Sequence, residues 1–293
     1  MPMSERKLAI VVIPVHNRKA HTMHCLAGLK WCLGSPEWKV VVVDDGSVDG
    51  TAEEIARDFP EVDLVFGNGN LYWTGGILAG MRRGIELGAT AFVWLNDDTE
   101  TSESSLRSLV SRVTANTNEM VGASPWVDES PMAFSSLRGV GVAANAGERL
   151  RVDVLAGFLV AFSVEVVRKI GLPDADGYPH YAGDSEYTRR AQNMGVELWL
   201  DGDAVVKLRG FKPYPTVAEH FWGPDTLDLV ARFKRTFLER RSQFRLATQK
   251  KLDQLYRGKV LGMAAFLIRL CLWAGQIGIA KRGRAVRSAK MSF

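Results

Sequence analysis

Residues Phe92–Thr99 read F-V-W-L-N-D-D-T, an apolar run that ends abruptly in Asn96, Asp97 and Asp98. A buried strand that stops at adjacent carboxylates places negative charge at the C-terminal edge of a sheet, where open α/β sheets bind ligands. Two neighbouring carboxylates repel each other unless a cation joins them, so the pattern favours a divalent metal that holds a substrate's phosphates. A surface turn is the alternative interpretation, since Asn and Asp are also good turn residues.

Apolar segments alternate with helical patterns on both sides of this stretch. Continuous apolar runs predict strands buried on both faces over Leu8–Ile13, Lys39–Val43 and Ala91–Leu95, and a further strand is predicted over Val62–Phe66. Helical spacing follows each strand, over Lys19–Leu33, Thr51 to about Phe59, Gly76–Leu87 and Leu106–Thr114. Thr51 and Glu54 are spaced for a capping box. The alternation predicts a parallel, doubly wound sheet over roughly the first 120 residues.

The rest of the chain is expected to complete this sheet and then to become helical. A strand is predicted over Leu155–Phe162 and short strands over Val196–Leu200 and Ala204–Leu208. Helices are predicted over Val164–Ile170 and Asp184–Met194, each stopped by a glycine. From Asp225 onward the pattern is helical to the end. We therefore expect an α/β domain over residues 1–224 and a helical extension over residues 225–293.

The bulk composition is that of a soluble globular protein. Of the 293 residues, 46% are hydrophobic and 24% are charged, and the net charge of +4 does not indicate nucleic-acid binding. The three cysteines (Cys25, Cys32 and Cys271) show no C-x-x-C spacing, which is typical of a reducing cytosol without a disulfide framework. The N-terminal M-P-M-S-E-R-K has no signal-peptide layout, so a cytoplasmic location is expected.

Polar groups follow three strands of the predicted sheet. They are Pro14-Val15-His16-Asn17, Asp44-Asp45-Gly46-Ser47 and Asn96-Asp97-Asp98. Asp44 or Asp45 can accept a hydrogen bond from a base N–H or a ribose hydroxyl, and Gly46 lets a backbone approach closely. Taken alone, D-D-G-S is more typical of a turn before a helix. Convergence of all three groups at one sheet edge is the more specific signal.

The loop Gly67–Gly76 reads G-N-G-N-L-Y-W-T-G-G. Its glycines and asparagines, among them Asn70 and Gly75, suit a backbone that wraps a ligand, and its amides can contact phosphates. Tyr72 and Trp73 can stack on a sugar or base, or can pack beneath the loop. The G-x-G has no third glycine at Rossmann spacing, and no glycine turn follows the first strand, which argues against a dinucleotide fold.

A further acidic group, Asp184, lies in H-Y-A-G-D-S-E, just before a helix that carries Arg189 and Arg190. One interpretation is an N-cap, which is worth about 1 kcal/mol. The other is a general base that takes a proton from an acceptor hydroxyl. In isolation the motif favours the N-cap.

Together these segments resemble inverting family 2 glycosyltransferases with the GT-A fold. The resemblance rests on V-V-I-P-V-H-N-R, V-V-V-D-D-G-S-V-D-G-T, F-V-W-L-N-D-D-T and G-D-S-E-Y-T-R-R-A-Q-N-M-G, in this order across about residues 8–208. Gly67–Gly76 and L-N-D-D-T look most similar to bacterial rhamnosyl- and galactofuranosyl-type members. The implied fold class is a doubly wound mixed α/β sheet with a C-terminal helical extension.

The resemblance implies transfer of a sugar from a UDP- or dTDP-sugar, with inversion, to a hydroxyl of a bacterial cell-surface glycan or a lipid-linked acceptor. Asp184 matches the family's general base. Asp98 matches the last carboxylate of its D-x-D motif, which contacts Mg²⁺ or Mn²⁺ and the diphosphate. The implied nucleotide-sugar contacts are Pro14, His16, Asn17, Asp44, Asp45, Gly46, Asn70, Trp73, Gly75, Asn96 and Asp97.

The chain departs from the family pattern at three places. Asn96 stands where the motif's first Asp often is, which weakens one ligand or leaves it bridged by water. Gly183 replaces the acidic neighbour of the base, while Glu186 matches a later acidic position. The segment that often carries a metal-binding His, residues 204–210, has none. His220 is then the candidate second metal ligand, or else Lys207 or Arg209 neutralises the diphosphate.

These departures leave two other functions open. One is a nucleotidyltransferase, which also needs a metal at such a sheet edge. The other is a catalytically silent protein that binds a sugar nucleotide or a glycan.

The C-terminal helical segment is apolar over Val260–Ala280, although Arg269 and Gln276 interrupt it and argue against a helix that spans a membrane. A basic cluster follows, made of Lys281, Arg282, Arg284, Arg287 and Lys290. An apolar face with a basic flank indicates a helix on an anionic membrane, here through residues 260–290 at the inner face of the cytoplasmic membrane. Packing on the α/β domain or on a second subunit is the alternative.

Overall fold

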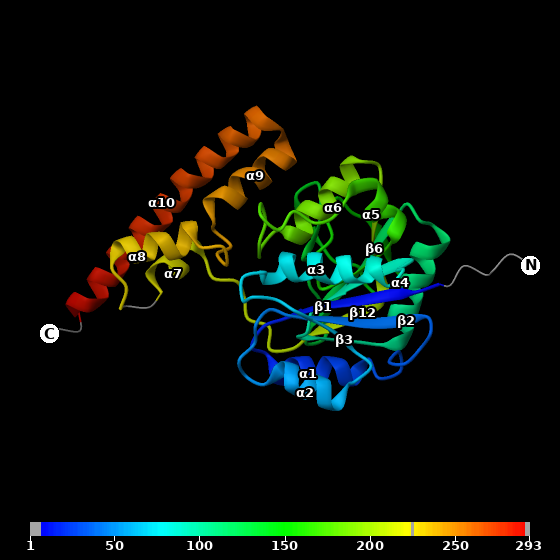
Figure 1. The fold of residues 1–293 in the computed structure, drawn as a ribbon. Coiled ribbons are helices and arrows are strands. Elements are labelled where there is room, and N and C mark those ends of the chain that lie inside the picture. Colours follow the sequence, from blue (N-terminus) through cyan, green and yellow to red (C-terminus); the bar gives the residue numbers. More distant parts are fainter. Residues whose placement is uncertain (1–6, 224–225, 291–293) are drawn as a thin grey trace, which may run out of the picture. The chain divides into compact units, whose positions relative to one another are not determined.

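The computed structural model describes residues 7–223 and 226–290 (Figure 1). The chain divides into two compact units, the first made of residues 1–179 and 183–211 and the second of residues 180–182 and 212–293. The predicted helical extension, residues 225–293, lies within the second unit, which begins earlier, at Lys212.

Among the described residues, ten strands of the first unit form one mixed sheet. Eight of them follow the order β10-β12-β6-β11-β4-β1-β2-β3, in which β10 is Arg149–Arg151 and β12 is Glu197–Leu208. The other two are β5 (Thr99–Thr101), which pairs with β12, and β7 (Ser130–Pro131), which pairs with β6. The strands β4 (Ala91–Leu95), β1 (Ala9–Val15), β2 (Trp38–Asp44) and β3 (Asp63–Phe66) are neighbours in this order, and β3 lies at the edge. These four run parallel, as predicted, while β11 (Leu159–Ser163) runs antiparallel between β4 and β6 (Glu119–Val127). The predicted doubly wound, mixed α/β sheet is confirmed.

Helices cover both faces of this sheet (Figure 1). One face carries α1 (Lys19–Gly28), α2 (Thr51–Asp58) and α4 (Glu103–Ala115). The other carries α3 (Tyr72–Glu86), α5 (Val164–Ile170) and α6 (Gly183–Asn193).

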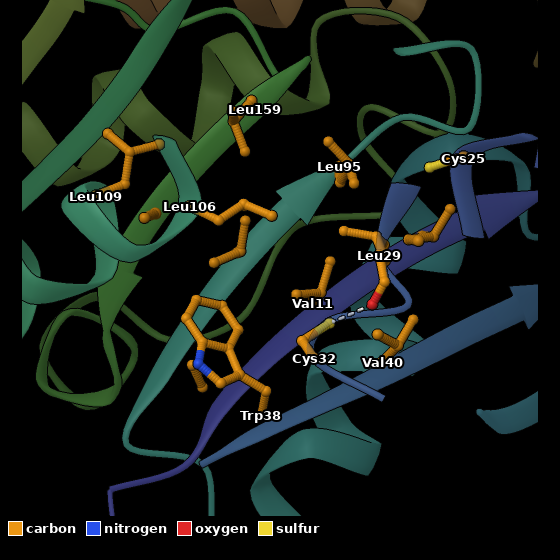
Figure 2. Close-up of a cluster of buried hydrophobic side chains, with 14 of the residues drawn as sticks. Val11, Cys25, Leu29, Cys32, Trp38, Val40, Leu95, Leu106, Leu109 and Leu159 are labelled. Atoms are coloured by element: carbon orange, nitrogen blue, oxygen red, sulfur yellow. Dashed lines mark hydrogen bonds between the residues drawn. The ribbon is translucent and has the colours of Figure 1, made fainter. Parts of the chain in front are cut away.

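The alternation of side chains along β1 explains the continuous apolar pattern of that strand. Val11 and Ile13 point into one core cluster and Ile10 and Val12 into the other, and all four are fully buried. Figure 2 shows the first cluster, in which Val11 lies among side chains from the neighbouring strands and from α1 and α4. A strand without a solvated face has no polar positions to alternate with.

Helix α3 approaches the sheet closely because three glycines face it. An added Cβ would lie 2.7 Å from Pro14 at Gly76, 2.2 Å from Val12 at Gly80 and 2.5 Å from Phe92 at Gly84. These distances leave no room for a side chain, and the three positions are four residues apart on one helix face. Gly76 therefore serves helix packing, although the sequence placed it in a ligand-binding loop.

Several element boundaries differ from the predictions. The capping box at Thr51 is wrong: the N-cap of α2 is Gly50, with φ 82°, and Thr51 N instead donates to Asp49 Oδ1 (3.1 Å). Helix α3 begins at Tyr72, four residues earlier than expected. The predicted strand at 155–162 begins only at Leu159, so residues 155–158 form a loop.

The edge of the sheet beyond β6 was largely unpredicted. The two short strands expected at 196–208 are one long strand, β12 (Glu197–Leu208), whose register shifts between Asp201 and Val205. Three short strands of this sheet, β5 (Thr99–Thr101), β7 (Ser130–Pro131) and β10 (Arg149–Arg151), were not predicted. Neither were β8 (Ser135–Leu137) and β9 (Val140–Val142), which pair with each other in a separate sheet. Segments of two or three residues are too short to show a periodicity.

The second unit is helical, as expected. Its elements are α7 (Val217–Trp222), α8 (Leu229–Phe233), the π-helical turn η1 (Lys234–Leu238), α9 (Leu246–Arg257) and α10 (Lys259–Lys290). A small core gathers Val217, Phe221 and Phe237, with Trp273 of α10 packed against it.

Candidate active site at the carboxyl edge of the sheet

The loops that follow β1 and β2 are bonded to each other at the carboxyl edge of the sheet. Asn17 N donates to Ser47 Oγ (2.9 Å), and Val48 N donates to Asn17 Oδ1 (2.8 Å). His16 Nδ1 donates to the carbonyl oxygen of Asp45 (2.7 Å). Asn17 has a left-handed backbone, with φ 51°, which is uncommon outside glycine and often marks functional sites. The structure thus brings together the polar groups that the sequence placed after these two strands.

Asp44 and Asp45 are buried, and their carboxylates hold backbone amides. Asp44 Oδ1 accepts from Ser47 N (2.9 Å). Asp45 Oδ1 accepts from Gly69 N (2.8 Å), and Asp45 Oδ2 accepts from Tyr72 N (2.9 Å). Asp45 therefore shapes the glycine-rich loop directly. Its role toward a nucleotide stays a prediction, which the second lone pair on each oxygen still permits.

The remaining candidates in this region have mainly backbone and packing contacts. Gly46 lies against the glycine-rich loop, since a Cβ there would be 3.1 Å from Gly69 N. Asn70 N donates to Asn68 Oδ1 (3.1 Å). Gly75 is buried in the first turn of α3, and Pro14 packs beneath the same helix. Their predicted contacts with a donor remain predictions.

An arginine that the sequence analysis overlooked lies across the two carboxylates after β4. Arg18 Nη1 is 3.2 Å from Asp97 Oδ1, and Arg18 Nη2 donates to Asp98 Oδ2 (2.8 Å). Thr22 Oγ1 donates to the other oxygen of Asp97 (3.3 Å). The predicted cation between these carboxylates is therefore, in this structure, the chain's own guanidinium. The only signal for it was its place directly after P-V-H-N.

The carboxylates of Asp97 and Asp98 have different surroundings. Burial raises the pKa of Asp97 to about 7, with Arg18 opposing the rise and Asp98 adding to it. The Asp98 side chain is 28% exposed, but its Oδ1 is buried without a hydrogen-bond partner. A buried, unpartnered carboxylate oxygen is costly unless something binds it. Within residues 7–223 and 226–290, no group of three His, Cys, Asp or Glu side chains is placed to hold a metal.

The protein can therefore offer a cation the carboxylates of Asp98 and Asp97. Mg²⁺ and similar ions are commonly bound by one or two carboxylates, with substrate phosphates and water filling the other positions. The donor set fits such an ion, provided that the remaining ligands come from the substrate.

The amide oxygen of Asn96 already has a hydrogen-bond donor within the protein, and the predicted contact of Asn96 with a donor sugar nucleotide stays a prediction. The indole N–H of Trp73 donates to Asn96 Oδ1 (2.8 Å), and because an indole nitrogen only donates, the amide oxygen must face it. Trp73 also packs edge-on against Trp94, with ring centroids 5.6 Å apart. The structure thus shows Trp73 packed within the protein, and its predicted stacking on a sugar or base stays a prediction.

Asp184 is tied to the loop that precedes β11. Its Oδ2 accepts from Gly157 N (2.8 Å) and its Oδ1 from Ser185 N (2.7 Å). Asn96 N in turn donates to the carbonyl oxygen of Phe158 (3.2 Å), so one short loop joins Asp184 to the end of β4. Burial raises the pKa of Asp184, which makes it a stronger base than an ordinary carboxylate. Asp184 lies inside the first turn of α6, which begins at Gly183, and therefore is not the N-cap.

The neighbour of Asp184 is a glycine for a steric reason. A Cβ at Gly183 would lie 2.0 Å from Thr74 Oγ1 and 3.0 Å from Thr74 Cβ. No acidic side chain can stand at this position while α6 packs on α3 in this way. Glu186, two residues after Asp184, is bonded within its own helix to Arg190 (2.6 Å).

The groups considered as replacements for a metal-binding histidine have other partners. Arg209 Nη1 donates to Glu100 Oε1 (2.6 Å) and also contacts His24, while Arg209 N donates to the carbonyl oxygen of Asp98 (2.8 Å). His220 belongs to the second unit, where its Nδ1 is 3.2 Å from Thr236 Oγ1 and burial lowers its pKa. Its role as a metal ligand stays a prediction.

Comparison with known proteins places the first unit in a family. The model described as "Glycosyl transferase family 2" matches residues 10–167, more than half of the chain. No curated protein gives a significant match to the sequence.

Solved structures share the fold at low identity. They include GalNAc-T7 with UDP, GalNAc and Mn²⁺ (14% identity, TM-score 0.55, 85% of this chain and 51% of that one). The Pyrobaculum calidifontis mannosyltransferase PcManGT with GDP-Man and Mn²⁺ is another (17%, TM-score 0.54, 97% and 81%). A third is S. aureus TarS 1-349 (13%, TM-score 0.55, 97% and 92%). This chain thus spans about half of GalNAc-T7.

Proposed function

The chain belongs to glycosyl transferase family 2, and on this basis we propose that it transfers a sugar, with inversion, from a nucleotide diphosphate donor to a hydroxyl group of a glycan. The observation that carries the proposal is the connection between Asp184 and the end of β4. Asp184 is bonded to Gly157 N, and the adjoining Phe158 carbonyl is bonded to Asn96 N. The proposed base and the carboxylates that follow β4 are thereby connected through one short loop.

In the proposed step, Asp184 accepts the proton of the acceptor hydroxyl. The hydroxyl oxygen forms a bond to the anomeric carbon, while the bond from that carbon to the diphosphate breaks on the opposite side, which inverts the configuration. The raised pKa of Asp184 favours proton transfer near neutral pH. Its two backbone hydrogen bonds fix the carboxylate before the acceptor arrives.

We assign the metal contact to Asp98, with Asp97 beside it. The unpartnered Asp98 Oδ1 supports this assignment, and two of the similar structures contain Mn²⁺. A bound Mg²⁺ or Mn²⁺ would stabilise the negative charge on the departing diphosphate. The chain itself supplies two carboxylates whose negative charge attracts such an ion, together with the loop contacts that fix the position of these carboxylates.

The donor and acceptor classes follow from the sequence resemblance alone. Gly67–Gly76 and L-N-D-D-T favour a UDP- or dTDP-sugar of the rhamnosyl or galactofuranosyl type. The proposed acceptor is a hydroxyl of a bacterial cell-surface glycan, carried free or on a lipid.

Helix α10 supports an acceptor at a membrane surface. Its stretch Lys259–Lys281 is long and apolar enough to cross a membrane, and only 17% of its most apolar window is buried. The exposed side chains form a stripe along one side, at Val260, Leu261, Leu267, Ile268, Leu272 and Ile279.

The opposite side of α10 is already occupied. A Cβ at Gly262 would lie 2.5 Å from Gln254 Cα of α9, and Arg269 forms an ion pair with Asp253 of α9 (2.7 Å). Helix α9 carries Lys250, Lys251 and Arg257, whose charges do not enter a bilayer's core. We therefore propose that α10 lies on an anionic lipid surface rather than across it. The basic side chains at 282–290 that the sequence assigns to this contact lie outside the described side chains.

Vesicle sedimentation tests this contact. The protein should bind vesicles that contain phosphatidylglycerol and should not bind pure phosphatidylcholine vesicles. Replacing Leu261, Ile268 and Leu272 by Asn should abolish binding, whereas Leu137→Asn with Val140→Asn, which removes exposed apolar groups of the first unit, should not. If the triple variant instead dissolves a dimer and lipid binding is absent, the stripe is a subunit contact.

The transferase activity itself is tested with a panel of UDP- and dTDP-sugars and glycan acceptors, by following released nucleotide diphosphate and glycosylated product. Asp184→Asn should lower turnover by about 10²–10⁴-fold while donor binding persists. Asp201→Asn is a matched control, because Asp201 is also a buried carboxylate that accepts a backbone N–H (Asp203 N, 3.0 Å). Diphosphate release from a nucleoside triphosphate would indicate a nucleotidyltransferase, and saturable donor binding without transfer or hydrolysis a silent binding protein.

A further inference from the structure

We infer that Arg18 is the resident counter-ion of Asp97 and Asp98, and that a divalent cation that joins these two carboxylates displaces this guanidinium onto the donor's diphosphate. Metal and nucleotide binding would then be coupled through one side chain. The inference rests on the proposed function, because it assumes that a metal and a diphosphate meet at Asp98.

The first argument is the geometry of the Arg18 guanidinium, whose two terminal nitrogens each contact a different carboxylate. One guanidinium nitrogen is 3.2 Å from Asp97 and another is 2.8 Å from Asp98, so Arg18 neutralises both carboxylates at once. Asp98 Oδ2, its bonded oxygen, is thereby occupied, while Oδ1 is buried and unpartnered. A cation that binds Asp98 through both oxygens, or that lies between the two carboxylates, requires the position that Arg18 holds.

The exposure of the three side chains supplies the second argument. Asp97 is 4% exposed in its side chain and is also held by Thr22, so it is fixed. Arg18 is 39% exposed, which leaves its side chain an open route away from the pair. The backbone before it is anchored, since Asn17 is bonded to both Ser47 and Val48. A rotation of the Arg18 side chain, without movement of the loop, therefore suffices.

The energetics supply the third argument. A charge-assisted hydrogen bond to a carboxylate is among the stronger protein hydrogen bonds, so displacing Arg18 into water weakens cation binding. Phosphate oxygens accept from a guanidinium as well as carboxylates do. When a diphosphate is present, Arg18 keeps an anionic partner after it leaves Asp98. By linkage, the nucleotide then strengthens metal binding, and the metal strengthens nucleotide binding by the same factor.

Titration with Mn²⁺, with free Mn²⁺ followed by electron paramagnetic resonance, tests this directly and requires no turnover. In the unaltered protein, Mn²⁺ should bind weakly alone and about tenfold or more tightly with saturating UDP. In Arg18→Met, Mn²⁺ alone should bind about tenfold more tightly than in the unaltered protein. The factor by which UDP raises the Mn²⁺ affinity should fall below about threefold in this variant.

Lys19→Met is the matched control. It removes one positive charge from the residue next to Arg18, but that ammonium pairs with Glu54 (3.3 Å) and not with the carboxylates after β4. Its Mn²⁺ affinity and its response to UDP should equal those of the unaltered protein. If both variants bound Mn²⁺ more tightly by a similar factor, the cause would be the change in net charge, and the inference would be overturned.

The remaining outcomes are separable. If Arg18→Met binds Mn²⁺ as weakly as the unaltered protein, or more weakly, Arg18 only supports the loop and the inference is wrong. If that variant does not fold, Arg18→Lys is used instead, because it keeps the positive charge but lacks the planar fork of the guanidinium. In Arg18→Lys, UDP must raise the Mn²⁺ affinity by a smaller factor than in the unaltered protein. If no variant binds Mn²⁺ even with UDP or dTDP, the metal assignment under the proposed function fails as well.

Discussion

Trp73 donates its indole N–H to Asn96 Oδ1 across 2.8 Å, which joins the first turn of α3 to the end of β4. The contact gives the amide oxygen of Asn96 a hydrogen-bond donor. An Asp at this position of the motif could ligate a cation, whereas this Asn is engaged in a structural contact. The proposed metal contacts are therefore Asp98 and Asp97, and Asn96 supports the start of α3.

We expect Trp73→Phe to lower the free energy of unfolding by about 0.5–1.5 kcal/mol. Phe keeps an aromatic ring against Trp94 but leaves the Asn96 oxygen without its donor. Urea denaturation followed by circular dichroism measures the change. Asn96→Asp is the control, since its carboxylate still accepts from the indole. An unchanged midpoint in Trp73→Phe would mean that the hydrogen bond does not stabilise the fold.

We expect a side chain at Gly183, directly before Asp184, to lower the free energy of unfolding. Gly183→Ala places a Cβ 2.0 Å from Thr74 Oγ1, and overpacking of this kind costs about 1–3 kcal/mol. The double variant Gly183→Ala with Thr74→Ala should recover part of that loss, because the oxygen and the methyl group that clash are gone. Thermal unfolding measures both, and equal losses in the single and double variants would contradict the steric explanation.

The rate of transfer should fall as the pH is lowered. A base acts only when it is deprotonated, and burial raises the pKa of Asp184, so activity is lost at a higher pH than an ordinary Asp would allow. The pH profile of kcat/KM, measured under donor saturation, shows this as an acid limb. The limb should be absent from the residual activity of Asp184→Asn. A limb that persists unchanged in that variant would belong to another group.

Removal of divalent metal should abolish transfer, and added Mn²⁺ or Mg²⁺ should restore it. Asp98→Asn should weaken Mn²⁺ binding in the presence of nucleotide by at least about tenfold, because it removes charge and a preferred oxygen ligand. Asp63→Asn is a suitable control, since Asp63 pairs with Arg83 (2.9 Å), away from the edge loops. Full activity in excess chelator would show that the diphosphate is neutralised without a metal.

Local pattern was enough to predict the parallel core of the sheet. The strands β1, β2 and β4 are buried on both faces, so their sequences are continuous apolar runs, and the intervening helices must cross over them. The start of α3 was predicted four residues late, at Gly76, because the preceding residues, including Gly75, resemble a loop. Gly75 instead lies where the first turn of the helix contacts Leu71, since an added Cβ would be 3.1 Å from Leu71 Cβ, and only the folded position of Leu71 reveals that requirement.

The sequence by itself determined the sheet, the order of the motifs and their place after particular strands, because each depends on neighbours within a few residues. The tertiary structure alone decided what these groups touch. Arg18 and Asp98 are 80 residues apart, and Gly157 and Asp184 are 27 apart, so no local pattern encodes their contacts. The residue before Asp184 was likewise decided by the tertiary structure. Thr74, on another helix, leaves no volume at position 183 for anything larger than glycine.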